Sequence, residues 1–261
     1  MAYDAYMRGL ADSSADTQER RESAILQLTE AIAEDPQFAL AHAELSYVLA
    51  VKYFESESRP VWLEKAEYHC ARALELDSNL AEAHMSGAYL LWSPARNFAH
   101  CDAIEEVQRA LAFQPNVPHA HNRLGTISAH IGRLEEAFAF YEKGQRASPR
   151  NRSSHGIVQA YVWSGDFEAA TREIESWLKE SPNHLYPIYF RPLPALLSGD
   201  LKAAGTLVKE AIQLLPGEPL VITLQGMLRA FEGEAEPALE SVRQACGAAR
   251  SFGSFPLHTN I

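Results

Sequence analysis

Residues 132–149 read GRLEEAFAFYEKGQRASP, and this stretch decides the fold. Its apolar residues recur three and four positions apart, at Leu134, Ala137, Phe138 and Tyr141. This spacing is the period of an amphipathic α-helix. The stretch opens with a glycine, which favours the left-handed turn that ends a preceding helix. It closes with Pro149, which cannot continue a helix interior. The pattern therefore predicts a turn, one helix and a stop.

The same pattern recurs along the chain with a nearly constant period. Six alanines each stand twelve residues before an anchor position, and they are Ala24, Ala66, Ala103, Ala137, Ala170 and Ala204. The anchors are Pro36, Ser78, Pro115, Pro149, Pro182 and Pro216. The anchors are 42, 37, 34, 33 and 34 residues apart, so the first two spacings contain insertions. A seventh alanine, Ala238, follows in register. A fixed period of this length indicates one supersecondary unit stacked many times.

Two further marks keep the same phase. A second small residue stands seven positions after most of the alanines, at Ala31, Ala73, Ala110, Gly144, Ala211 and Ala245. Small residues two turns apart on one helix face let neighbouring helices approach closely, and a leucine there should overpack the contact. A glycine stands five positions before the alanine in the later units, at Gly132, Gly165, Gly199 and Gly233. These glycines predict the turns between the two helices of a unit.

Together these residues resemble the tetratricopeptide repeat, a helix-turn-helix unit of 34 residues. The resemblance covers nearly the whole chain and implies an all-α, right-handed superhelical solenoid of about seven units. We expect one solenoid domain, 1–261, with units at 3–36, 37–78, 79–115, 116–149, 150–182, 183–216 and 217–250, and the start of a truncated eighth unit at 251–261. Neither end offers the polar capping repeat that usually closes a solenoid, so we interpret the chain as a fragment of a longer protein whose uncapped ends can self-associate.

The sixth unit departs from the pattern because its first helix, LYPIYFRPLPALL, contains three prolines. Pro192 and Pro194 fall where helix interior is expected, and each costs a helix about 3 kcal/mol. One interpretation is a kinked or shortened helix that its neighbours tolerate. The other is a bend that redirects the solenoid and shapes a binding surface.

Composition excludes several function classes. The 261 residues include 23 basic and 34 acidic side chains, for a net charge of −11, and no basic stripe suits a nucleic-acid partner. Three cysteines, Cys70, Cys101 and Cys246, are widely spaced, which is typical of a reducing compartment. Neither a signal peptide nor an apolar run of membrane-spanning length occurs. We expect a soluble, cytoplasmic chain that makes no membrane contact.

The histidines are interpreted as structural. His42, His84 and His121 each stand six residues after an anchor, and recurrence at one repeat phase is what a packing position shows. The pairs His69-Cys70 and His100-Cys101 are adjacent residues, which point in different directions on a helix. No phosphate loop, nucleophile elbow or paired metal-helix motif is present. We therefore predict no metal, no cofactor and no enzymatic activity. A catalytic alternative would rest on a cluster of His119, His130, Arg152 and His155.

In tetratricopeptide-repeat proteins the first helix of each unit lines the concave groove. The resemblance therefore implies that residues at fixed distances after each anchor face a bound partner. The predicted partner-binding residues are Glu44, Tyr47, Met85, Tyr89, His119, Asn122, Arg123, Arg152, His155, Gln159, Tyr186, Tyr189 and Phe190. They form a polar, partly basic middle with aromatic ends. This pattern favours an extended or helical peptide that carries an acidic group. The alternative is a generic surface that binds no ligand in this chain.

Two function classes follow. The first is a protein-interaction scaffold that binds a peptide or a partner protein. The opening YDAYMRGL and the segment EAIAEDPQFALAHAELS resemble the C-terminal repeat modules of bacterial signalling and transcriptional regulators, in which a winged-helix, kinase or nucleotide-cyclase domain precedes the repeats. That resemblance implies a regulatory or sensory module. A free-standing adaptor, or a module that binds a small anion at Arg123 and Arg152, is the alternative. The second class is an enzyme hosted by the helical repeat.

Overall fold

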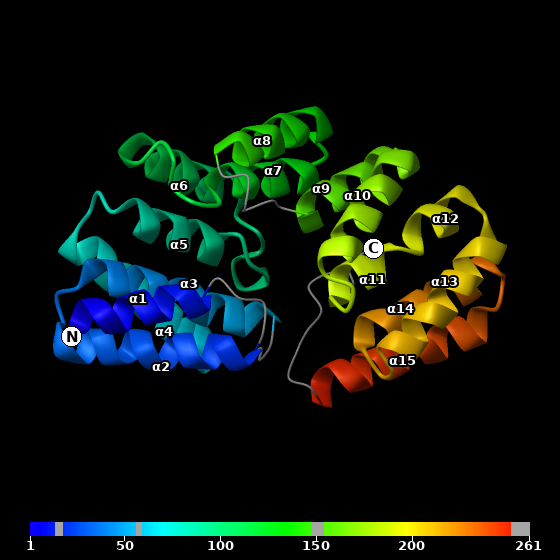
Figure 1. Ribbon diagram of the computed structural model, residues 1–261, viewed down its shortest axis with the longest axis horizontal. Helices are drawn as coiled ribbons and strands as arrows, with labels where there is room; N and C mark the ends of the chain where they lie inside the picture. The colour runs from blue at the N-terminus through cyan, green and yellow to red at the C-terminus, as the bar shows by residue number, and fades with distance from the viewer. Residues whose placement is uncertain (14–17, 56–58, 148–153, 252–261) are drawn as a thin grey trace. The chain divides into compact units, whose positions relative to one another are not determined.

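The computed structural model describes residues 1–13, 18–55, 59–147 and 154–251, and every regular element in these ranges is a helix (Figure 1). The all-α prediction is confirmed. The helices pack into two compact units, one from Met1 to Ile127 and one that begins at Ser128. We describe each unit by itself.

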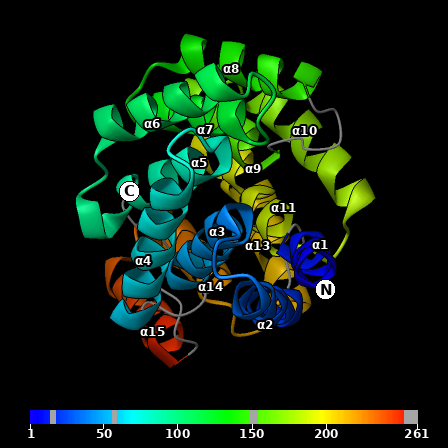
Figure 2. The ribbon, with the colours of Figure 1, turned by 90° about the vertical axis from the view of Figure 1, so that its left-hand side faces the viewer.

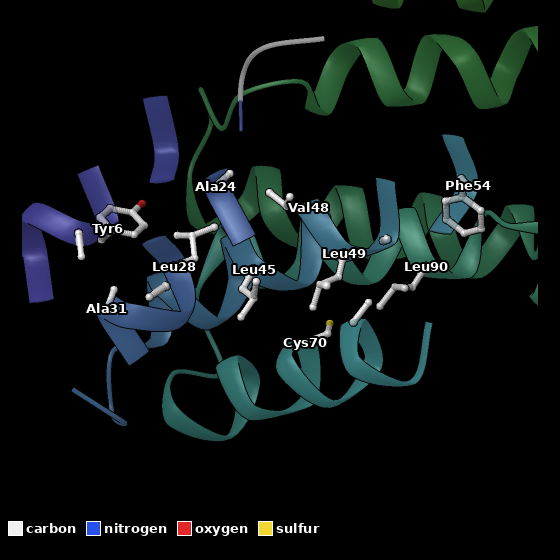
Figure 3. Close-up of a cluster of buried hydrophobic side chains, with 14 residues drawn as sticks. Tyr6, Ala24, Leu28, Ala31, Leu45, Val48, Leu49, Phe54, Cys70 and Leu90 are labelled. Carbon is white, nitrogen blue, oxygen red and sulfur yellow. The ribbon is translucent and has the colours of Figure 1, made fainter. Parts of the chain in front are cut away.

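The first unit contains helices α1 to α6 and most of α7. Their bounds are α1 Ala2–Ser13, α2 Gln18–Glu34, α3 Ala39–Glu55, α4 Pro60–Leu76, α5 Ala81–Leu91, the short 3-10 helix η1 Pro94–Arg96, α6 His100–Phe113 and α7 Ala120–His130. Helix α3 contacts α1, α2, α4 and α5, and α5 in turn contacts α6 (Figure 2). Apolar side chains from five helices meet in one cluster around Leu28, Leu45, Leu49, Cys70 and Leu90 (Figure 3).

The second unit continues the alternation of helices. It contains the end of α7, α8 Leu134–Ala147, α9 Ser154–Ser164, α10 Phe167–Glu180, α11 Leu185–Phe190, α12 Leu193–Ser198, α13 Leu201–Leu214, α14 Pro219–Phe231 and α15 Ala235–Ser251. Helix α9 contacts α8, α10 and α11, and α14 contacts α11, α13 and α15. Its largest core cluster joins Val158, Ile174, Leu196, Val208 and Leu224. None of the described helices combines the length and the apolarity that crossing a bilayer requires.

The repeated small residues lie at helix contacts, as the sequence predicts. Each of the six alanines twelve residues before an anchor has 0% of its surface exposed. The second small position is buried in every unit where it is alanine or glycine. An alanine side chain that is fully covered brings the neighbouring helix against the backbone. These sites therefore set the spacing between helices.

Glycine and proline end the helices at the predicted points. The anchors Pro36, Ser78, Pro115, Pro182 and Pro216 all lie in turns just after a helix, and Pro149 lies outside the described residues. Gly132, Gly165, Gly199 and Gly233 have φ values of 79°, 76°, 88° and 84°, in the left-handed region that favours glycine. In two of these turns the next residue, Asp166 or Asp200, accepts a hydrogen bond at 3.0 Å from a backbone N–H in the first turn of the following helix.

The prolines of the sixth unit interrupt its first helix. Helix α11 ends at Phe190 and α12 begins at Leu193. Arg191 and Pro192 keep right-handed helical angles, so the chain continues in a helical direction while the hydrogen-bond ladder is broken. The Arg191 side chain bonds Glu175 of α10 at 3.0 Å and Glu210 of α13 at 2.8 Å. The interruption is thus tied to α10 of the fifth repeat and to α13 of the sixth.

Candidate functional site

The best-defined candidate site in the first unit is a cluster of three aromatic rings and one arginine. The guanidinium carbon of Arg123 lies 4.2 Å from the ring centroid of Tyr89 and 5.5 Å from that of Trp92. The Tyr47 and Tyr89 rings meet edge to face with centroids 5.4 Å apart. We call Tyr47, Tyr89, Trp92 and Arg123 the Arg123 cluster. Its members come from α3, α5 and α7, the first helices of three successive pairs, and from the residue that follows α5.

Among the described residues, no ion pair neutralises the charge of Arg123. In the part of the chain that the structure describes, no carboxylate pairs with this guanidinium, whereas Arg96, Arg109 and Arg191 each pair with glutamates. The side chain is half-buried. A guanidinium that stacks on aromatic faces keeps its N–H groups at its edge, where they can bind a carboxylate in a bidentate manner. The geometry therefore suits an anionic group from outside the described chain.

A polar region with the opposite charge lies on α1, α3 and α5. Glu44 accepts a hydrogen bond from the hydroxyl of Ser13. Burial raises the pKa of Glu44, and the nearby Glu82 carboxylate adds to the rise. Burial, together with these two glutamates, raises the pKa of Tyr6 to about 12. Tyr6, Glu44 and Glu82 are thus close enough to interact electrostatically on consecutive first helices.

The remaining predicted residues of the first unit differ in how clearly they join this site. His119 stands just before α7 with φ of 64°, and its carbonyl accepts a hydrogen bond at 2.8 Å from the N–H of Arg123. Desolvation by surrounding groups, with a further contribution from the Arg123 charge, lowers the pKa of His119. Met85 and Asn122 are half-buried on α5 and α7. The structure brings together Tyr47, Tyr89 and Arg123, three of the residues that the repeat phases singled out.

The predicted residues of the second unit form a different arrangement. The His155 ring lies 4.8 Å from that of Tyr186 and 5.3 Å from that of Phe190. Tyr189 and Phe190 are buried in the core cluster of the unit, which corrects their assignment to a partner-binding surface. Helix α11 contacts α9, α10 and α14, and side chains from these helices share the core cluster with both residues. Gln159 is half-buried, and Arg152 lies outside the described residues.

Trp92 was not among the predicted site residues. It follows Tyr89 by three positions, a spacing that places two side chains on one helix face. That spacing was the signal available in the sequence. It did not identify Trp92 because the residue belongs to the inserted segment after α5, where the repeat phase no longer applies.

Two of the histidines at the common repeat phase make equivalent contacts. The Nε2 atoms of His42 and His84 lie 3.3 and 3.0 Å from the carbonyl oxygens of the anchors Pro36 and Ser78. Their Nδ1 atoms face the second helix of the unit, at 2.8 Å from Nδ1 of His69 and 2.6 Å from a carboxylate oxygen of Glu106. Both rings are buried. These contacts join a helix to its preceding turn, so the two residues are structural.

The residues of the catalytic alternative have separate neighbours where the structure describes them. The His130 ring contacts Trp163 at 4.9 Å, whereas His155 contacts Tyr186 and Phe190. Within the described ranges, no group of three or more His, Cys, Asp or Glu side chains is arranged to hold a metal ion.

Comparison with known proteins gives a family match and a set of similar structures. The Tetratricopeptide repeat family model matches residues 102–152. A tetratricopeptide repeat protein from Parabacteroides merdae has a TM-score of 0.64 and 16% identity, covering 96% of this chain and 94% of that one. PilF from Pseudomonas aeruginosa has a TM-score of 0.57 and 20% identity, covering 86% and 96%. PilW, a type IV pilus biogenesis factor, has a TM-score of 0.60 and 19% identity, covering 78% and 92%. No curated protein matches the sequence. Likeness at these identities shows the fold alone.

Proposed function

We propose that this chain, which is a tetratricopeptide-repeat protein, is a scaffold that binds a peptide segment carrying a carboxylate, and that the Arg123 cluster receives this group. The observation that carries the proposal is the position of Arg123 over Tyr89 and Trp92 without an ion pair among the described residues. The fold supports the general role, because a solenoid presents the first helices of successive units as an extended binding surface.

The physical argument rests on preorganisation. Both rings hold the face of the Arg123 guanidinium, so less side-chain entropy is lost when its edge binds an anion. The cation–π contact contributes about 0.5–2 kcal/mol, depending on how far the site is desolvated. The chain as a whole carries a net charge of −11, so a local cationic group is needed to attract an acidic segment. Tyr47 and Tyr89 offer ring surface to the apolar side chains next to the carboxylate.

The proposal is tested by screening an array of synthetic peptides, each with a free C-terminal carboxylate or the matching amide, and by measuring the affinity of the selected peptides calorimetrically. Arg123→Gln keeps a polar side chain and removes the charge. We expect it to weaken binding by about tenfold or more, as loss of a central arginine anchor commonly does. Amidation should have a comparable effect on any peptide that binds through its terminus.

Arg133→Gln is the matched control. Arg133 is exposed, directly precedes α8 and contacts Glu136 of that helix at 3.6 Å, and it is not a member of the Arg123 cluster. We expect this variant to bind as the wild type does. Equal affinity of the wild type and Arg123→Gln for every selected acidic peptide would overturn the assignment of the site. Failure of the wild type to prefer carboxylate over amide, for terminal and side-chain acids alike, would overturn the ligand class.

We further propose that the chain is the regulatory module of a bacterial signalling protein that acts in the cytoplasm. The support is the resemblance of its first two units to such modules and the free thiols of Cys70, Cys101 and Cys246, which suit a reducing compartment. The coding sequence on either side of the chain tests this proposal. An output domain encoded upstream would support it, and further repeats alone would favour a free-standing adaptor.

A further inference from the structure

The last described helix, α15, carries an exposed apolar face. Leu239 and Val242 each have 45% of their surface exposed, and Cys246 follows one turn later and is also exposed. The three residues are three and four positions apart, so they lie on one side of the helix. They stand one, four and eight positions after Ala238, the seventh alanine of the repeat.

The other units show what normally covers this face. Four positions after the equivalent alanine stand Leu28, Cys70, Val107, Tyr141, Ile174 and Val208, and each is at most 7% exposed. In two examples the first helix of the next unit contacts the helix that carries this residue and contributes to the same core cluster. Leu28 of α2 packs in one cluster with Leu45 of α3, and Val208 of α13 packs in one cluster with Leu220 and Leu224 of α14. The Val242 position is exposed because no described helix follows α15 in that role.

Helix α1 carries an exposed apolar face that suits this position. Tyr3, Met7 and Leu10 are 62%, 43% and 36% exposed. Helices α1 and α14 can be aligned by one glycine in each, because both glycines lie against the residue four positions after the repeat alanine. A Cβ built on Gly9 would meet Leu28, four positions after Ala24, and one built on Gly226 would meet Val242, four positions after Ala238.

In this register the exposed residues of α1 correspond to covered residues of α14. When Gly9 of α1 is aligned with Gly226 of α14, each exposed residue of α1 has a counterpart in α14. Tyr3 aligns with Leu220, Met7 with Leu224 and Leu10 with Met227. All three α14 residues pack into the core of the second unit, which also includes Val208 of α13. The exposed face of α1 is therefore the face with which α14 covers the preceding helix pair.

We propose that α1 of a second copy of this chain packs on α15, in the place of the first helix of a following unit. The contact continues the interface that the chain already repeats between its own helix pairs, and it joins two different surfaces. Such a heterologous contact adds copies head to tail and leaves one free face at each end. This inference stands independently of the peptide-binding proposal, since it involves none of the residues of the Arg123 cluster.

The test is sedimentation equilibrium of the full chain over a range of concentrations, with one lysine substitution in each face. We expect the average mass of the wild type to rise with concentration beyond that of a dimer. Met7→Lys and Val242→Lys should each weaken association by about tenfold or more, because a charge would be buried at the contact. Leu26→Lys is the matched control, since Leu26 is 71% exposed on α2 and belongs to neither face.

Mixing the two variants distinguishes this contact from a symmetric one. Met7→Lys keeps an intact α15 face and Val242→Lys keeps an intact α1 face, so the equimolar mixture should form a dimer that does not grow further. A wild type that stays monomeric at all concentrations would overturn the proposal. Loss of association in only one of the two variants would also overturn it, because it would indicate a symmetric contact or a different partner surface. Circular dichroism of each variant confirms that the lysine leaves the helices folded.

Discussion

Two glycine-to-alanine substitutions in helix interiors should have different effects on stability, because only one of the new methyl groups fits. Gly9 lies within α1 and Gly205 within α13. Alanine is favoured over glycine in a helix interior by about 1 kcal/mol, so the backbone contribution of the two substitutions is the same. The steric contribution differs. A Cβ on Gly205 would meet its nearest neighbour, Cδ2 of Leu228, at 3.7 Å, which is an ordinary van der Waals contact.

At Gly9 the new methyl group would not fit. Its Cβ would lie 2.7 Å from Cγ and 3.0 Å from Cδ2 of Leu28. Leu28 is fully buried within the core cluster, so it cannot move aside without displacing other side chains (Figure 3). Overpacking of this kind costs about 1–3 kcal/mol. After the helix-propensity gain of about 1 kcal/mol, Gly9→Ala should lower stability by roughly 0–2 kcal/mol.

The assay is thermal and urea unfolding of the whole chain, followed by far-ultraviolet circular dichroism. Gly205→Ala should raise the melting temperature of its transition by about 2–4 °C, and Gly9→Ala should lower it or leave it unchanged. The difference between the two variants, about 1–3 kcal/mol, is the steric cost itself. Leu28→Val should recover part of that cost in the Gly9→Ala background, since it shortens the clashing side chain. Equal stabilisation by the two alanines would refute the packing argument.

Three further perturbations have defined outcomes. Gly199→Ala should cost about 1–2 kcal/mol through the backbone alone, because the residue has φ of 88° and no atom lies within 4 Å of its Cβ position; Gly199→Asn, measured by the same unfolding assay, should cost less. Ser46→Ala should lower the free energy of unfolding by about 1–3 kcal/mol, because the buried Ser46 hydroxyl donates to the Ala66 carbonyl at 2.7 Å and accepts from Ser86 at 2.6 Å. A loss of stability no larger than that of an exposed serine substitution such as Ser198→Ala would contradict this. Burial, with the nearby His42 and Lys65, lowers the pKa of His69 from 6.5 to about 4. The unfolded chain therefore takes up a proton that the folded chain does not, and stability should fall as pH decreases from about 6.5 to about 4. The difference in stability between the wild type and His69→Gln, measured across this pH range, isolates the effect from carboxylate titration. A stability difference that does not vary with pH would contradict the prediction.

The helices and their ends could be predicted from sequence because the signals are local. A fully covered alanine, a glycine with positive φ and a proline just past a helix each act within a few residues, and each recurs at a constant phase. The phase also placed Tyr47, Tyr89 and Arg123 on successive first helices, where the structure finds them in contact. The same reasoning failed for Trp92, where an insertion after α5 ends the repeat phase, and for Tyr189 and Phe190, which neighbouring helices bury in the core.

The sequence alone determined the all-α fold and which face of each helix is apolar, since both follow from the spacing of residues along one helix. The tertiary structure decided which of those faces are covered. Val208 and Val242 occupy the same repeat phase, yet Val208 is 1% exposed and Val242 is 45% exposed. It also decided that Arg123 stacks on two rings, whereas Arg191 binds two glutamates. The periodicity of a helix specifies the direction of a side chain, but burial and charge pairing depend on what another helix places opposite it.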